Sequence, residues 1–186
     1  MMLTVRDSAL DDFQFVARRL RRADRLELRY ASGGREPTDV LESYFKVARL
    51  SHAAPESVFL KTAFAGDEPV AIFGANPALS LGVAYCWMVG TGSLRSFPLD
   101  IARGAKAHID AMLSVHPILT NIVWDKNTLH VNWLHRTGFV FLRPLYNYNG
   151  SGQTFLQFMK HGVPMDMTRI LDKRWQLQGQ EDAANV

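Results

Sequence analysis

The sequence predicts an α/β (α+β) domain of three layers, with a mixed central sheet of six to seven strands flanked by about four helices. Three observations favour this fold class. The apolar runs 57–64 and 69–76 lie either side of a short polar turn, which is typical of an antiparallel hairpin. The run 82–90 is almost continuously apolar, as expected of a central strand covered on both faces. Later apolar runs alternate with amphipathic helical stripes.

Composition is that of an ordinary globular chain. Hydrophobic residues make up 47% of the 186 residues and charged residues 21%. The single cysteine, Cys86, excludes an intrachain disulfide and fits a reducing compartment. The first ten residues lack the apolar core of a signal peptide, and no apolar run is long enough to span a membrane. We therefore expect a protein of the cytoplasm, or one packaged from a cytoplasm.

The N-terminal part predicts one strand and two helices. Residues 3–5 form a short strand candidate, and Asp7 or Ser8 can cap the helix that follows. The apolar stripe of that helix consists of Phe13, Val16, Ala17 and Leu20. After a glycine-containing loop, Pro37 suits the first turn of a second helix. This helix ends at the segment 51–57. The stripe of the second helix consists of Leu41, Tyr44, Phe45 and Ala48.

The second half alternates helices with strands. Pro98 can begin a helix, and 116–124 is the next strand. The inward face of this helix is formed by Ile101, Ala105, Ile109 and Met112. Asn127 caps a further helix, Gly138 ends it, and Phe139 begins a strand.

The last strand, 154–160, places two sets of side chains on opposite faces, namely Phe155, Gln157 and Met159 against Leu156, Phe158 and Lys160. We expect one domain over 1–162. Residues 163–186 form a C-terminal extension whose polar end we expect to be partly flexible.

The formal charge is only +3, but six arginines gather between Arg18 and Arg29. The favoured interpretation is a solvated helical face on which Asp24 and Glu27 are local partners. The alternative is a basic surface that binds nucleic acid, and no stacking aromatics are interleaved with the arginines to support it.

The order of these elements resembles that of the GCN5-related N-acetyltransferase (GNAT) superfamily over Leu3 to Lys160. The resemblance is strongest where a strand containing Trp124 is followed by Asn127, a helix and the pair Gly138–Phe139.

A narrower resemblance is to the acetyltransferase-like internal virion or morphogenesis proteins of short-tailed, T-seven-type bacteriophages. It rests on 72–77, on 86–94 with its Trp87-to-Thr91 run, and on 127–141. It implies a phage protein made late in infection, in the host cytoplasm or the virion, whose partners are other virion or host proteins.

The GNAT resemblance implies acetyl-CoA as the cofactor, held by a strand edge and a helix N-terminus. The residues that would hold it here are Met88, Val89, Gly90, Arg95, Ser96 and Asn127. The family's phosphate pattern, Arg or Gln, two residues, Gly, one residue, then Gly or Ala, is missing. Gly90 and Gly92 stand before the helix instead, and Pro98 removes one amide donor. The amides of Ser96 and Phe97 remain as candidate phosphate donors.

The catalytic pattern also departs from the family. The tyrosine that many relatives carry four residues before the Gly is replaced by Leu134, which has no proton to donate. The substitute acid–base candidates are His130, Asp125 and Tyr146. Each also has a structural interpretation: His130 as a packing residue, Asp125 as a helix cap and Tyr146 as an exposed surface aromatic. His130 and His135 do not share a helical face, so no metal site is predicted.

We expect a bacteriophage protein with the acetyltransferase fold that is degenerate or non-catalytic and acts in virion assembly or host interaction. The first alternative is an active acetyl-CoA-dependent N-acetyltransferase acting on a protein or a small amine. The second is a nucleic-acid-associated virion protein, which rests on the arginines from Arg18 to Arg29.

Overall fold

The computed structural model describes residues 2–50, 58–80 and 82–162. The strands are β1 (Leu3–Asp7), β2 (Phe59–Ala65), β3 (Glu68–Pro77), β4 (Val83–Gly90), β5 (Ile118–Trp124), β6 (Val140–Leu145) and β7 (Phe155–His161). The helices are α1 (Leu10–Arg18), α2 (Arg22–Ala31), α3 (Pro37–Leu50), α4 (Pro98–Val115) and α5 (Thr128–Arg136), with short 3-10 turns η2 (Gly92–Ser96) and η3 (Tyr148–Gly150). The predicted C-terminal extension, 163–186, lies outside the described residues.

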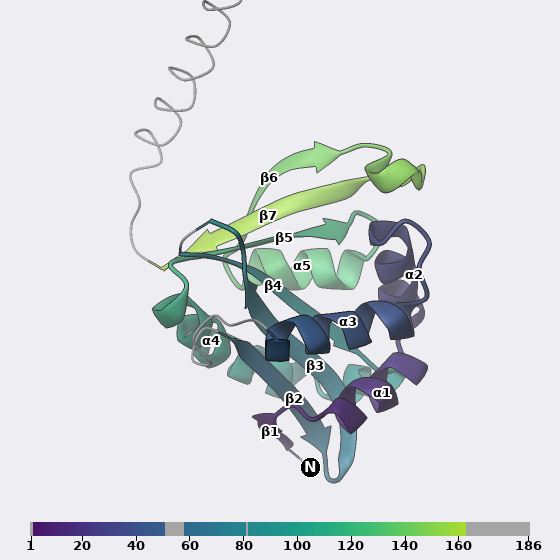
Figure 1. Ribbon diagram of the computed structural model, residues 1–186. Coiled ribbons are helices and arrows are strands. Elements are labelled where there is room, and N and C mark those ends of the chain that lie inside the picture. Colours follow the sequence, from purple (N-terminus) through teal and green to yellow (C-terminus); the bar gives the residue numbers. More distant parts are fainter. Residues whose placement is uncertain (1, 51–57, 81, 163–186) are drawn as a thin grey trace, which may run out of the picture.

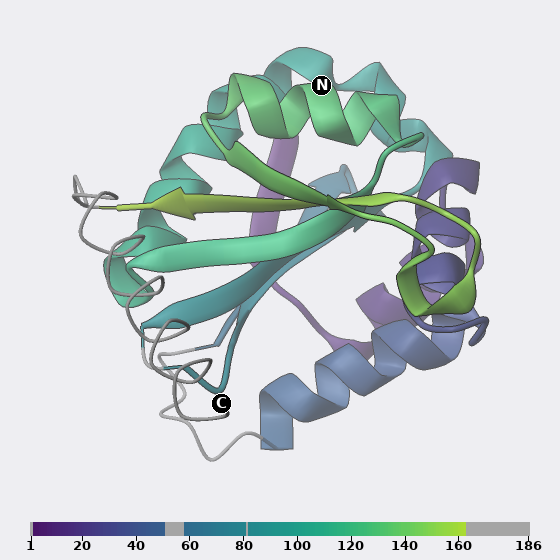
Figure 2. The ribbon, with the colours of Figure 1, turned by 90° about the horizontal axis from the view of Figure 1, so that it is seen from above.

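All seven strands form one sheet in the order β1-β2-β3-β4-β5-β7-β6. Every neighbouring pair is antiparallel except β4 and β5. Helices α1, α2 and α3 lie on one face of the sheet, and α4 and α5 lie on the other (Figures 1 and 2). The predicted class, a three-layer α/β fold with a mixed sheet, is confirmed, as are the β2–β3 hairpin and the central place of β4.

The first predicted helix is in fact two helices, α1 and α2, so three helices precede β2 instead of two. The chain leaves the helical path because Leu20 forms an antiparallel bridge with Thr91. Arg21 then has an extended ψ of 145°, and its amide donates to the carbonyl oxygen of Gly90 at 2.9 Å. The end of β4 thus interrupts the helix, which no local pattern signals.

The start of α1 also differs from the prediction. Ala9 occupies the N-cap position, and its backbone amide donates to the Asp12 side chain at 2.8 Å. Ser8, one of the two predicted caps, instead shares a hydrogen bond with the Thr62 hydroxyl of β2 at 2.8 Å. The other, Asp7, accepts from Lys61. Contacts with β2 have therefore replaced local capping.

The only parallel pairing within the described sheet is short. β4 pairs with β5 through Val83–Tyr85 and Ile118–Thr120, and the carboxyl halves of the two strands separate beyond that point (Figure 1). The side chain of Asn121 donates to the carbonyl oxygen of Cys86 at 3.0 Å where the separation begins. The sheet is therefore open between the carboxyl ends of its two central strands.

The end of α5 follows the prediction closely. Gly138 has a φ of +80°, and its amide donates to the carbonyl of His135. The amide of Phe139 donates to the carbonyl of Leu134, which completes a Schellman motif. Phe139 is then buried against Phe158 of β7. Gly138 ends the helix and Phe139 enters the core, as the sequence predicts.

The core has one part on each face of the sheet. Residues from α1 and α3 pack on β2, β3 and β4, with Phe13, Leu41 and Ile72 fully buried. On the other face, α4 and α5 pack on β4, β5 and β7. Ala105, Ile109 and Met112 are buried there as predicted. Among the described helices, none has the length and apolar character needed to cross a membrane.

Candidate functional site

The edge of β4 faces the opening between the central strands. Within an antiparallel pair, backbone groups of alternate residues point to opposite sides of the strand. Cys86 and Gly90 point toward the opening, because the Cys86 carbonyl bonds Asn121 of β5 and the Gly90 amide bonds Asp24 of α2. Met88 lies midway between them, so its amide and carbonyl face the opening as well. An extended ligand can pair with this edge as an additional strand does.

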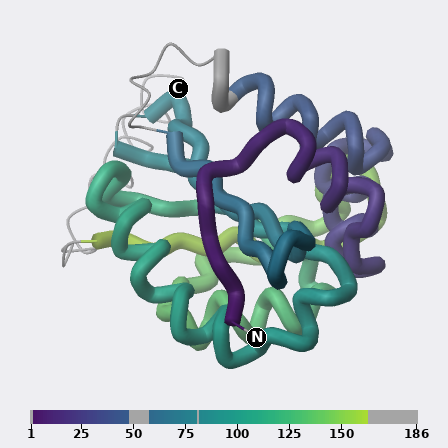
Figure 3. The backbone as a smooth tube through the Cα atoms, turned by 90° about the horizontal axis from the view of Figure 1, so that it is seen from below, coloured from purple at the N-terminus to yellow at the C-terminus, as the bar shows by residue number. Residues whose placement is uncertain are grey.

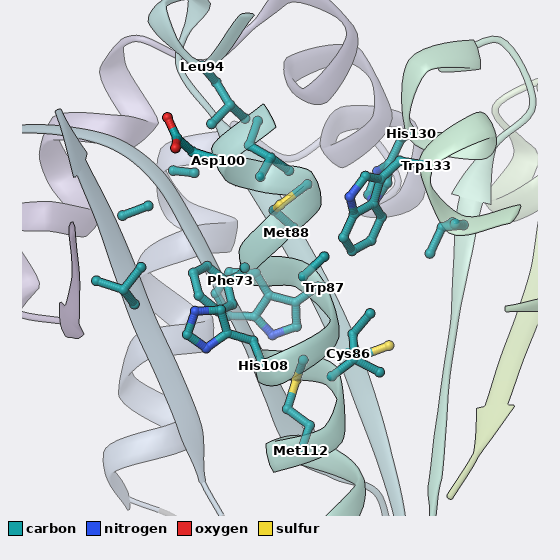
Figure 4. A pocket seen from close by; sticks show the side chains of 18 of the residues that line it. Phe73, Cys86, Trp87, Met88, Leu94, Asp100, His108, Met112, His130 and Trp133 are labelled. Atoms are coloured by element: carbon teal, nitrogen blue, oxygen red, sulfur yellow. The ribbon is translucent and has the colours of Figure 1, made fainter. Parts of the chain in front are cut away.

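A cavity of about 370 Å³ adjoins the opening, between the sheet and helices α4 and α5. Figure 4 shows Met88 in its wall, with His130 and Trp133 of α5 to one side and Leu94 and Asp100 to the other. The cavity continues beneath α4 toward Phe73 and His108 and, beyond them, toward β1. Most of its lining side chains are apolar. Its volume falls in the range of small-molecule sites.

Asp24 is the centre of a buried hydrogen-bond network at the end of the opening. Its side chain is almost fully buried and forms an ion pair with Arg21, which is itself buried. One Asp24 oxygen accepts the Gly90 amide at 2.9 Å, and the other accepts the side-chain amide of Asn127 at 3.3 Å. A single carboxylate thereby joins α2 to the end of β4 and to the start of α5.

Glu27 lies one helical turn after Asp24. Its Oε2 accepts the Asn127 side-chain amide at 2.8 Å, and its side chain keeps 16% exposure. Burial raises the pKa of Glu27 to about 8, and the neighbouring Asp24 charge adds to the rise, against the opposing hydrogen bond from Asn127. A carboxyl with this pKa exchanges its proton close to neutral pH. That is the property of a general base.

His130 faces Glu27 from α5. Burial lowers the pKa of His130 to about 4, so the ring is neutral at pH 7. Its Nδ1 is 3.9 Å from Glu27 Oε1, too long for a hydrogen bond, and has no partner among the described residues. Trp133 Nε1 likewise has no partner within that part of the chain. Both residues line the cavity with other parts of their rings, and the two nitrogens are themselves buried.

Asn127 stands at the N-cap position of α5, but its side chain does not cap the helix. Its amide group donates to Asp24 and Glu27 of α2 instead. The predicted role of this side chain as a local cap is therefore wrong. The physical reason is that two carboxylates of α2, about a hundred residues earlier in the chain, accept hydrogen bonds from the same side chain.

The residues expected to bind the phosphates of the cofactor include groups that favour an anion and groups that oppose one. Arg95 and Ser96 are exposed on η2, just before α4. The Phe97 amide donates to Leu94, so the prediction that it is free is wrong. Pro98 occupies the first position of α4, and the Asp100 carboxyl lies in its first turn. An acidic group there opposes a second anion at the helix N-terminus.

The remaining candidates do not gather at one point. Tyr146 is 77% exposed in the β6–β7 connection. Asp125 follows β5; its amide bonds Thr154, and its Oδ1 has no partner among the described residues. Leu134 is 2% exposed and lines the cavity. Val89 is buried in the core.

The arginine-rich segment is not a uniform solvated face. Arg21 is 7% exposed and paired with Asp24, which removes it from any basic surface. The sequence predicts Asp24 and Glu27 only as local partners of the arginines, whereas the structure connects both to the start of α5. Their i,i+3 spacing, which places both on one helical face, was the available signal.

No three metal-ligating side chains come together within the residues described here.

Neither a protein-family model nor a curated protein sequence matches the chain. Solved structures do match its fold. The chain is similar to a spermidine N-acetyltransferase from Vibrio cholerae, solved with CoA and spermine, with a TM-score of 0.63 at 15% identity over 87% of this chain and 96% of that one. It is similar to Ard1 from Thermoplasma volcanium, with a TM-score of 0.60 at 17% identity over 88% and 99% of the two chains.

A third similar structure is an acetyltransferase of the GNAT family from Streptococcus pneumoniae, with a TM-score of 0.59 at 15% identity over 86% of this chain and 99% of that one. The three alignments cover between 86% and 88% of this chain. The chain therefore has the fold of the GCN5-related N-acetyltransferases.

Proposed function

We propose that this protein is an N-acyltransferase that takes its acyl group from a CoA thioester. The observation that carries the proposal is the opening between β4 and β5, where the backbone of Met88 faces a gap that leads into the cavity. A pantetheine arm is extended and carries amides, so it suits that strand edge. The similar spermidine N-acetyltransferase from Vibrio cholerae was solved with CoA, which supports the proposal.

When bound, such a donor supplies an acyl group activated by its thioester bond. The attacking amine must lose a proton as the new C–N bond forms. We assign this proton to Glu27, which lies 3.9 Å from the cavity residue His130 and whose pKa of about 8 keeps a fraction of it ionised at neutral pH. Asn127 holds the Glu27 carboxyl in place through its 2.8 Å hydrogen bond. The acceptor side therefore has a base, with Asn127 as its positioning residue.

The departing thiolate also needs a proton, and here the chain departs from the family. Leu134 has none to give, and the indole of Trp133 is no practical source. His130 is neutral at pH 7 because its pKa is about 4. We infer that solvent returns this proton and that His130 serves as a neutral wall of the site. Asp125 and Tyr146 have no role in this scheme.

Release of free thiol tests the proposal. Acetyl-CoA and decanoyl-CoA are mixed with a panel of amines, such as a polyamine, a free amino acid and a peptide N-terminus. We expect thiol release that depends on both the amine and the thioester, with the amide product identified by mass spectrometry. The same release in the Glu27→Gln variant would show that the transfer does not use this base.

A second candidate is a non-catalytic member of the fold that acts in phage virion assembly or host interaction. Buried Leu134 in place of tyrosine favours it, as do Pro98 and Asp100 at the start of α4. Binding of CoA without any transfer, together with co-purification with virion or host proteins, would favour this candidate. Binding to DNA that weakens steeply with salt would instead favour the nucleic-acid alternative.

A further inference from the structure

We propose that the cavity beneath α4 holds the hydrocarbon chain of the donor. The preferred thioester then carries a medium-length acyl chain, on the order of ten carbons. This inference rests on the proposed function and specifies its donor. It starts from the cavity's own shape and chemistry.

Four of the residues that line the cavity are small, and larger side chains at these positions would reduce its volume. They are Ala63 of β2, Ala71 of β3, and Gly104 and Ala105 of α4. A Cβ added at Gly104 would meet nothing nearer than the His108 ring at 3.8 Å. Protein interiors normally contain few voids larger than a water molecule. A hollow of about 370 Å³ is therefore a feature that a ligand would fill.

The volume of the cavity fits a hydrocarbon chain and is larger than an acetyl group needs. An engineered apolar cavity of about 150 Å³ takes up benzene, which has six carbons. The cavity here, at about 370 Å³, is more than twice as large. Its lining follows α4 from Ile101 to Met112, and a helix rises about 1.5 Å per residue, so the cavity is roughly 16 Å long.

The chemistry of the wall suits an uncharged chain. Few lining residues carry a polar group, and none of the lining residues is lysine or arginine. Burial lowers the pKa of His108, which keeps its ring neutral. Burial raises the pKa of the Cys86 thiol to about 12, so the thiol stays protonated and does not attack a thioester. A free fatty acid would place its carboxylate near Asp100 with no cation in the wall, which favours the thioester over the acid.

The position of the cavity connects it to the donor site. One end reaches Met88 and Trp133 at the opening, and the other reaches Leu3 and Val5 of β1. Figure 3 shows β1 crossing the near side of the molecule, with its first residues on the side of α4. A chain that begins at the strand edge of Met88 thus runs under α4 toward β1.

Calorimetric titration of the full chain tests the inference with desulfo-CoA, acetyl-CoA, hexanoyl-CoA, decanoyl-CoA and decanoic acid, all below their micelle concentrations. Gly104→Leu narrows the cavity, and Ala63→Val narrows it from the strand side with a residue that strands accept. Ala107→Leu places the same leucine side chain on the exposed face of the same helix and is the control. Circular dichroism and the thermal midpoint establish that each variant is folded.

We expect decanoyl-CoA to bind at least ten times more tightly than acetyl-CoA, because each buried CH₂ is worth roughly fourfold in affinity. Both narrowing variants should lose this gain, and Ala107→Leu should keep it. Equal affinity for desulfo-CoA, acetyl-CoA and decanoyl-CoA would overturn the inference and leave the proposed donor site standing. Binding of decanoic acid without binding of any CoA compound would overturn the thioester as occupant, and with it the proposed function.

Discussion

Asp24 of α2 accepts the backbone amide of Gly90, the last residue of β4, at 2.9 Å. The same carboxylate pairs with buried Arg21 and accepts the side chain of Asn127 at the start of α5. One side chain therefore links the two sides of the opening between the central strands, at its carboxyl end. It also holds α2, which carries Glu27, at a fixed place beside that opening.

Asp24→Asn removes the charge that pairs with Arg21 and leaves the guanidinium buried without a counter-ion. We expect the free energy of unfolding to fall by roughly 3 kcal/mol, since removing one partner of a buried ion pair costs about that much. Urea denaturation followed by circular dichroism measures it. Asp39→Asn, on the exposed first turn of α3, is the control and should change stability little. Equal stabilities of the two variants would show that the buried pair contributes nothing.

Glu27→Gln should abolish the pH dependence of acyl transfer. In the wild type the rate should rise with pH through about 8, because only the ionised carboxylate accepts a proton. We expect the variant to be at least a hundredfold slower, in line with the usual contribution of a general base. Its affinity for desulfo-CoA should be unchanged. A wild-type rate that is flat between pH 6 and 9 would contradict this role.

The same residue predicts a pH effect on stability. The folded pKa of Glu27, about 8, lies above its ordinary value of 4.5, so its protonated form favours the fold. The contribution is complete below pH 4.5 and is lost as the pH rises toward 8. Relative to Glu27→Gln, the wild type should therefore become less stable between those values. Unfolding of both proteins at pH 5, 6.5 and 8.5 measures the difference, and a constant difference would disprove the shift.

The pKa of His130 predicts the opposite dependence of stability on pH. Its folded pKa, about 4, lies below the ordinary 6.5, so the neutral ring favours the fold. This contribution is complete above pH 6.5 and is lost as the pH falls toward 4. His130→Gln should lose less stability than the wild type over that interval in matched denaturation series. His135→Gln, at an exposed position of the same helix, should follow the wild type.

Gly138→Ala should destabilise the fold by about 1–2 kcal/mol, because a Cβ is disfavoured at a φ of +80°. The added Cβ would also come within 2.8 Å of the Lys160 amino group, which can move away. Gly92→Ala, where a Cβ meets nothing within 4 Å and φ is not positive, is the control. Similar midpoints of urea unfolding for the two variants would contradict the strain at Gly138.

The sequence was most informative where local chemistry decides the structure. Gly138 and Phe139 were predicted because a helix end needs a residue with positive φ and a buried anchor, and both requirements are visible in neighbouring residues. Pro98 was predicted as a helix start for a similarly local reason. The central place of β4 followed from an apolar run that only a strand covered on both faces carries.

The site was harder to predict because its contacts span the chain. The break between α1 and α2 depends on Leu20 meeting Thr91, and the side chain of Asn127 is directed by carboxylates about a hundred residues away. Glu27 looked like one more charge on an arginine-rich helix. Only its burial against α5 raises its pKa. The cavity could not be predicted from the sequence either, because the small residues that line it lie on three separate elements, β2, β3 and α4.

Calorimetric titration of the full chain with desulfo-CoA, combined with the thermal midpoint, tests whether the opening beside Met88 binds the donor. This compound carries the nucleotide and the pantetheine arm but no acyl group, so it reports on the opening beside Met88 alone. We expect saturable binding, and a stability gain of about 2.7 kcal/mol at a hundredfold excess over the dissociation constant. No heat of binding and an unchanged midpoint at millimolar ligand would contradict it and leave the fold as a scaffold.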